Sequence, residues 1–280
     1  MHTNYHMQHD AENYMQHHIN EAIPQILLSL PFALALVMYI VCVAISVYCG
    51  KSWSPYHTAS WIIGVFCAAL AVVGPLASDA HMDFTVHMLS HLLLGMLAPL
   101  LIVLAAPVTI VLRTLSVTSA RHLSRILRSR PVRIISNPIT ASLLNIGGLW
   151  ILYTTNLYMV MQQNMFVHIV LHMHVFLAGY LFTVSIIYID PTPHRTSFTY
   201  RAIVLVMALA GHSILSKHIY AHPPSGVPAA HAEKGAMLMY YGGDAIDLVL
   251  ISIFCFQWFR AARPRTLIGN THYTRKHQLD

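Results

Sequence analysis

Seven apolar stretches of roughly 20 residues alternate with short polar segments along the chain. Stretches of this length can cross the hydrocarbon layer of a bilayer as α-helices. The pattern therefore predicts an all-α fold, a polytopic membrane protein with a seven-transmembrane-helix bundle. Pro99 and Pro107 fall within the third stretch and predict kinks there. The predicted spans are residues 24–48, 59–77, 84–112, 139–160, 165–189, 200–221 and 236–259.

The composition supports this fold class and leaves little of the chain for a second domain. Of the 280 residues, 56% are hydrophobic and only 9% are charged, which is unlike a soluble domain of this size. We divide the chain into a His/Met-rich extracytoplasmic tail (1–22), a transmembrane domain (23–260) and a basic cytoplasmic tail (261–280). The N-terminal segment lacks a basic region followed by a short apolar core, so we expect no cleavable signal peptide.

The positive charges are distributed asymmetrically between the two sides of the predicted bundle. Lys and Arg gather after the first, third and fifth stretches and in the C-terminal tail, while only Lys217 and Lys234 fall on the other side. Because positive charge marks cytoplasmic segments, we expect the N-terminus outside and the C-terminus inside. This placement explains the basic character without nucleic acid as a partner. Residues 119–130 predict an amphipathic helix whose partner is the anionic lipid surface.

Histidine is the unusual residue of this chain, with 20 copies, most of them on the predicted outer side. His87 and His91 are four residues apart and therefore share one helix face, and His168 and His172 repeat this spacing. Polar side chains inside a membrane are costly, so their presence indicates a functional site.

Helix geometry places ligand-type side chains of four helices at a common depth. At about 1.5 Å of rise per residue, one such side chain from each of four helices lies roughly 10–13 Å below the outer boundary of the membrane. His87 and His168 lie one turn nearer to the outside. Polar groups presented at matched heights by several helices are typical of a metal site in a bundle. The four residues at the common depth are His91, His172, His212 and Asp244.

Each of these side chains can instead have a purely structural role. A single histidine inside a membrane can simply hydrogen-bond a neighbouring helix, and the same holds for Asp244 and Asp247. His174 points away from His172, and we expect a structural role for it.

The ligand types favour copper. Imidazole and thioether groups without a nearby thiolate suit copper, and the chain also carries 14 methionines. Oxygen ligands sufficient for magnesium or calcium are missing, whereas zinc held by three histidines remains an alternative. The His/Met-rich tail is an additional candidate for loose metal capture.

Four segments carry a family resemblance: HMLSHLLLGMLAPLLIVLAAPVTIVLR, HIVLHMHVFLAGYLF, AGHSIL and YYGGDAIDL. They resemble the CtaG family, seven-helix membrane proteins of bacterial cytochrome c oxidase assembly, and the resemblance covers about residues 61–258. It implies a plasma-membrane factor that inserts copper into a haem–copper oxidase, with an oxidase subunit as client and other copper chaperones as further partners. The ligands that it implies are His87, His91, His168, His172 and His212, with Asp244 nearby.

Three classes of function fit these observations to different degrees. The first is a copper-binding assembly factor, a metallochaperone. The second is a haem-binding membrane cytochrome, in which His91 with His172 or His212 would ligate the iron. The third is a copper or proton channel, but the inner helix halves offer little polar lining beyond Ser, Thr and Asn145. We find no nucleophile–base pair or phosphate loop, so we do not expect an enzyme.

Overall fold

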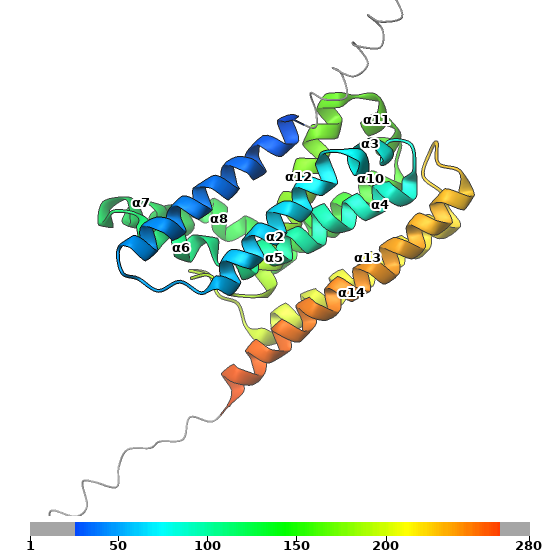
Figure 1. The fold of residues 1–280 in the computed structure, drawn as a ribbon. Coiled ribbons are helices and arrows are strands. Elements are labelled where there is room, and N and C mark those ends of the chain that lie inside the picture. The colour runs from blue at the N-terminus through cyan, green and yellow to red at the C-terminus, as the bar shows by residue number, and fades with distance from the viewer. Residues whose placement is uncertain (1–25, 264–280) are drawn as a thin grey trace, which may run out of the picture.

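The computed structural model describes residues 26–263, and this part of the chain is an all-helical bundle without strands (Figure 1). The predicted tail at residues 1–22 and most of the basic tail at 261–280 lie outside the described residues. The predicted all-α membrane fold is confirmed. Within the described residues, six helices are long and apolar enough to cross a membrane: Ile26–Tyr48, α2 (Pro55–Val72), Phe84–Leu104, α12 (Met165–Ile186), α13 (Phe198–Ala221) and α14 (Ala229–Ala262).

The fourth predicted span, residues 139–160, is divided into two parts. The chain is helical from Pro138 to Thr154 through α9 (Pro138–Ser142), a π-helical turn (Leu143–Gly147) and α10 (Gly148–Thr154). A break then separates this run from the short helix α11 (Leu157–Gln163). Among the described residues, six of the seven predicted spans are thus helices long enough to cross a membrane, and the fourth is this interrupted run.

The third predicted span is the central element and ends earlier than its hydropathy suggests. It comprises α4 (Phe84–Leu92), a π-helical turn (Leu93–Leu97) and α5 (Ala98–Leu104). Pro99 follows this turn, consistent with the irregularity expected around a proline, which lacks a backbone N–H. Pro107 does not kink the helix but terminates it, and it begins α6 (Pro107–Thr114).

Side chains from other helices satisfy the backbone groups at this early helix end. The carbonyl of Leu104 accepts from His57 Nδ1 at 2.7 Å, and that of Ala105 accepts from the Tyr39 hydroxyl at 2.9 Å. Ala106 takes a left-handed conformation with φ of 51°. On the other side of the break, Asp190 accepts from the first free N–H groups of α6. The break is therefore a fully hydrogen-bonded part of the fold.

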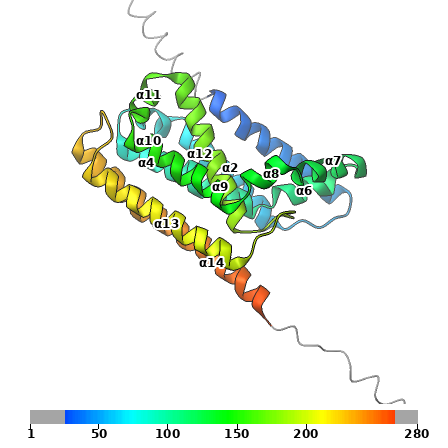
Figure 2. The ribbon, with the colours of Figure 1, turned by 180° about the vertical axis from the view of Figure 1, so that it is seen from behind.

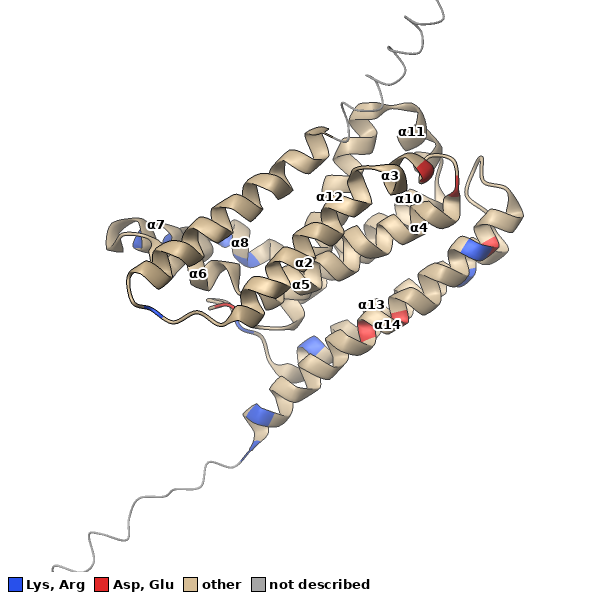
Figure 3. Cartoon of the chain, in the orientation of Figure 1, with Lys and Arg blue, Asp and Glu red and all other residues tan. Residues whose placement is uncertain are grey.

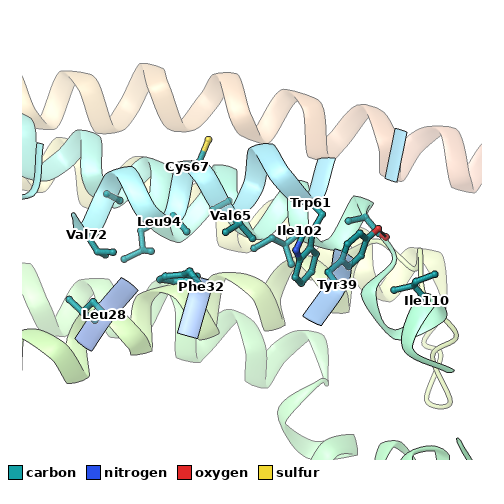
Figure 4. Packing of buried hydrophobic residues seen from close by; sticks show 14 residues of the cluster. Leu28, Phe32, Tyr39, Trp61, Val65, Cys67, Val72, Leu94, Ile102 and Ile110 are labelled. Atoms are coloured by element: carbon teal, nitrogen blue, oxygen red, sulfur yellow. Dashed lines mark hydrogen bonds between the residues drawn. The ribbon is translucent and has the colours of Figure 1, made fainter. Parts of the chain in front are cut away.

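The central helix is surrounded by its neighbours on several sides (Figures 1 and 2). Helix α14 packs along α4 and α13, while α2 packs against α5, and α12 contacts both α5 and the π-helical turn before it. On the side of α2, Tyr39 stacks on Trp61 with ring centroids 4.4 Å apart, and Phe32 and Leu28 continue this packing (Figure 4).

One close contact fixes α12 against the central helix. A Cβ atom at Gly179 of α12 would collide with the carbonyl oxygen of Gly95. Any larger residue at position 179 would therefore push α12 outward. Since α12 carries His168 and His172, this glycine helps to set their distance from α4.

Most of the Lys and Arg residues gather at the end of the bundle that holds α7 (Val117–Leu127) and α8 (Arg130–Ile135) (Figure 3). The predicted amphipathic helix is α7, none of whose residues is buried, and α8 follows it. Lys217 lies in the last turns of α13 and Lys234 in the first turns of α14, near the connection between these helices. The short helix α3 (Pro75–Asp79) precedes α4.

Candidate metal centre

Helix α4 brings two imidazoles into the bundle one turn apart. It starts at Phe84 because the carboxylate of Asp83 accepts a hydrogen bond from the backbone N–H of Thr85 at 2.7 Å. This bond is the main reason why the pKa of Asp83 is lowered from its ordinary value. His87 and His91 follow on the inward face, each only 6% exposed.

The first cavity lies between α4, α10, α11 and α12. It has a volume of about 20 Å³ and is lined by His87, His91 and His172 together with Tyr153 and Met161. This volume accommodates one particle of the size of a water molecule or a metal ion. His87 Nε2 lies 3.1 Å from the Tyr153 hydroxyl, and the rings of His87 and His172 are 6.4 Å apart between centroids.

Hydrogen bonding determines which nitrogen of His172 is left for a ligand. Its Nδ1 lies 2.9 Å from the backbone carbonyl oxygen of His168. A carbonyl can only accept, so Nδ1 carries the proton and the unshared electron pair of the neutral ring is on Nε2. This is the arrangement in which metal-binding histidines are commonly held.

A second cavity lies deeper and shares His91 with the first. It has a volume of about 30 Å³, and its polar lining includes His91, His212, Asn145 and Asp247. The Nε2 atoms of His91 and His212 are both buried and have no hydrogen-bond partner. Asp247 is also buried, at 7% exposure.

A glycine makes room for the ring of His212. A Cβ atom at Gly243 of α14 would lie 2.5 Å from His212 Cε1, well inside van der Waals contact. Gly243 therefore allows α14 to pack directly against this imidazole, which is 3% exposed.

Two predicted residues occupy places other than the cavity walls. The ring of His168 lines neither cavity; it stacks on His172 at 4.1 Å, and its Nδ1 is buried without a partner. Asp244 is exposed and is not brought to the imidazoles, whereas Asp247 is. The reason is rotational: residues three positions apart on a helix differ by about 60° in direction, so similar depth does not mean the same face.

His174 has the structural role that was predicted for it. Its Nε2 lies 3.1 Å from the carbonyl oxygen of Leu144, in the π-helical turn between α9 and α10. Tyr153 and Met161, by contrast, line the first cavity but were not predicted, because a single aromatic or Met residue in an apolar run resembles ordinary core.

The imidazoles are distributed over two cavities and do not form one compact cluster. Among the described residues, no group of three or more His, Cys, Asp or Glu side chains stands ready to hold a metal ion. Binding by three protein ligands would therefore require side-chain rotation. The shared residue is His91, which takes part in both cavities.

Comparison with known proteins places the chain in a family. The model of the cytochrome c oxidase caa3 assembly factor family (Caa3_CtaG) matches residues 37–261. Uncharacterized proteins of Mycobacterium bovis (strain ATCC BAA-935 / AF2122/97) and Mycobacterium tuberculosis (strain CDC 1551 / Oshkosh) are each 35% identical over 173 residues. These matches cover 59% of this chain and 26% of each relative, so the chain spans about a quarter of their length.

No solved structure matches the chain significantly. The family match nevertheless extends over all the helices that line the two cavities, and it confirms the resemblance found in the sequence. The chain therefore belongs to the family of cytochrome c oxidase caa3 assembly factors.

Proposed function

We propose that the protein binds copper in the outer half of its helix bundle and passes it to a haem–copper cytochrome c oxidase during assembly of that enzyme. Family membership supplies the role in oxidase assembly, and the copper step is our inference. The observation that carries it is the pair of buried Nε2 atoms of His91 and His212 without hydrogen-bond partners. Buried polar atoms without hydrogen-bond partners are rare, and a cation bound to the two imidazole nitrogens would supply the missing interaction.

The donor chemistry supports copper as the cargo. Around the first cavity are three imidazoles and the thioether of Met161, donors that suit copper, and no thiolate lines it. The distribution of ligands over two cavities also suits a cargo. A structural metal site has a closed set of four ligands, whereas an ion that must be released is better served by an incomplete set.

The dimensions of the cavities argue against the haem alternative. Their volumes are about 20 and 30 Å³, whereas sites for ligands of drug size or larger are typically about 300–1,000 Å³. A porphyrin between His91 and His172 or His212 would require the helices to separate.

We place the protein in the plasma membrane with its N-terminus outside and its C-terminus in the cytoplasm. The arginines of α7 and α8 would then face the inner leaflet, and the end of the bundle nearest His87 would face outward. In this orientation the site can receive copper from outside the cytoplasm. An oxidase subunit is the proposed client.

The test compares His91→Ala and His172→Ala with the control His174→Ala. The first two substitutions remove a ligand without adding charge, so copper affinity should fall at least about tenfold while the protein still inserts. The control removes an imidazole of the same bundle that lines neither cavity. Copper bound by the purified proteins is measured by elemental analysis, together with a visible spectrum that would reveal haem.

The same strains test delivery to the client. The oxidase from the His91→Ala and His172→Ala strains should contain its haems but lack the copper next to its active-site haem. Added copper should partly restore this occupancy by mass action. Full copper occupancy in the oxidase from both strains, with the variants present at normal levels, would reject these histidines as the delivery site.

A further inference from the structure

We propose that copper enters the site from an open cavity at the outer end of the bundle along a stack of three imidazoles, His81, His168 and His172, and that His81 is its first acceptor. This inference rests on the proposed function, because copper is taken as the cargo. It adds an entry route and a residue, His81, that lies in the connection before α4 and lines neither inner cavity.

The outer cavity is large and open. Its volume is about 260 Å³, more than ten times that of the first inner cavity. Its lining combines imidazoles and thioethers, the donors that suit copper. His81 and Met82 are both exposed, and Met82 retains 88% of its surface. The lining side chains of these two types are His81, Met82, Met159 and His231.

The rings form a continuous path from this cavity to the first inner cavity. The centroids of His81 and His168 are 4.9 Å apart, and those of His168 and His172 are 4.1 Å apart, both pairs stacked. The step from His172 to His87 is 6.4 Å. Burial increases along the path: His81 is exposed, His168 and His172 are half-buried, and His87 is 6% exposed.

Hydrogen bonds leave a donor nitrogen available at the outermost ring. His81 Nδ1 lies 3.0 Å from the side-chain oxygen of Gln162. The amide nitrogen of Gln162 donates to the Tyr158 hydroxyl at 2.9 Å, so its oxygen faces His81. His81 Nδ1 then carries the proton, and its Nε2 is free to bind a cation. In the middle of the path, the Nδ1 atom of His168 is buried without a partner.

The spacing of the rings suits transfer between adjacent ligands. Bonds from imidazole to a metal ion are about 2 Å long, so two nitrogens that share an ion are at most about 4 Å apart. The stacked rings have centroids 4.1 and 4.9 Å apart and face each other, so the imidazoles must rotate about their side-chain torsions to direct the in-plane electron pairs of two nitrogens at one ion. An ion that always keeps an imidazole ligand avoids the large cost of entering an apolar environment bare.

The position of the N-terminal helix adds a reason for entry at this end. The described chain begins at Ile26, and Figure 1 shows this end of the helix on the same side of the bundle as α3 and α11. The sequence just before it contains His17, His18 and Met15. These residues are donors of the same types as those that line the outer cavity.

The experiment measures the rate of copper loading separately from the final copper content. Metal-free full-length protein in nanodiscs receives a limiting amount of Cu(I), or in a parallel series Cu(II), and bound copper is determined after rapid desalting at successive times. His81→Ala should slow loading severalfold and leave the final copper content unchanged. His81→Met, which retains a copper donor, should restore part of the rate. The control is His222→Ala, which removes an exposed histidine that stacks on His218 and does not line the outer cavity.

The outcomes separate this inference from the proposed function. If the wild-type protein takes up neither form of copper, the proposed function fails and the entry route fails with it. If the wild type binds copper and His81→Ala loads at the same rate, only the entry route is overturned. If His81→Ala lowers the final copper content as well, His81 is a ligand of the resident site, and its role as first acceptor is likewise overturned.

Discussion

Replacing Gly243 by Ala should displace the imidazole of His212 and weaken copper binding. The new Cβ atom would lie 2.5 Å from Cε1 and 3.2 Å from Nδ1 of His212, whereas ordinary contacts start at 3.4 Å. The ring would have to move by about 1 Å, and the packing of α14 along α13 leaves little room for the helices to separate. Loss of a supporting contact to a metal ligand costs about 10- to 100-fold in affinity, so we expect at least tenfold.

The neighbouring position provides a matched control. A Cβ atom at Gly242 would lie 2.6 Å from Cδ1 of Leu92, the end of a flexible side chain that can rotate away. Both substitutions add one methyl group to the same turn of α14 and have the same effect on helix propensity. Gly243→Ala should also lower stability by about 1–3 kcal/mol through overpacking against a ring. Gly242→Ala should bind copper as tightly as the wild type.

The assay is competition for copper against a chelator of known affinity, with thermal unfolding measured in parallel. Wild-type affinity in a folded Gly243→Ala protein would refute His212 as a ligand. An equal loss in both variants would show that binding depends on general packing of α14 and not on the position of this imidazole.

Three further predictions concern the tail, the topology and the start of α4. Removing residues 1–20 should slow copper acquisition at low copper but leave the buried site able to bind; complete loss of copper from the folded truncated protein would make the tail the main site. Reporter fusions after Asn137 and Asp280 should behave as cytoplasmic and a fusion near Ser225 as extracytoplasmic, and a cytoplasmic signal at Ser225 would contradict the orientation. Because the pKa of Asp83 is lowered in the folded state, its stabilising effect is complete above about pH 4 and is lost as the carboxyl protonates at lower pH. Asp83→Ala should therefore lower the melting temperature at pH 7, and the melting temperature of the variant should fall less between pH 7 and acid than that of the wild type. The same dependence of melting temperature on pH in both proteins would contradict this.

Depth within the bundle could be predicted from the sequence because the rise per residue of a helix is nearly constant. This is why His91 and His212, on helices of opposite direction, were expected at one level and do line one cavity. Rotation could not be predicted in the same way. The direction in which Asp244 or Asp247 points depends on how α14 packs, and glycines such as Gly243 decide that packing.

The hydropathy pattern could not predict the local breaks in the helices either. Residues 84–112 form one predominantly apolar run, yet the membrane helix ends at Leu104 because Pro107 begins a new helix and Tyr39 and His57 satisfy the exposed carbonyls. Those two partners are distant in sequence, so the residues around the break do not indicate them. His81 was overlooked for a related reason: it lies outside the apolar spans, and only the fold stacks it on His168.

The division of the imidazoles between two cavities is consistent with the proposed role as a copper carrier. A carrier must hold its ion firmly enough to acquire it and loosely enough to release it to a client. A complete structural site holds zinc with about 10–16 kcal/mol, which would oppose release. Here His91 belongs to both cavities, so an ion could change partners, from His172 on one side to His212 on the other, while it keeps one ligand. A residue shared in this way should be the least replaceable of the set, and His91→Ala should reduce copper binding more than loss of either of its two partners.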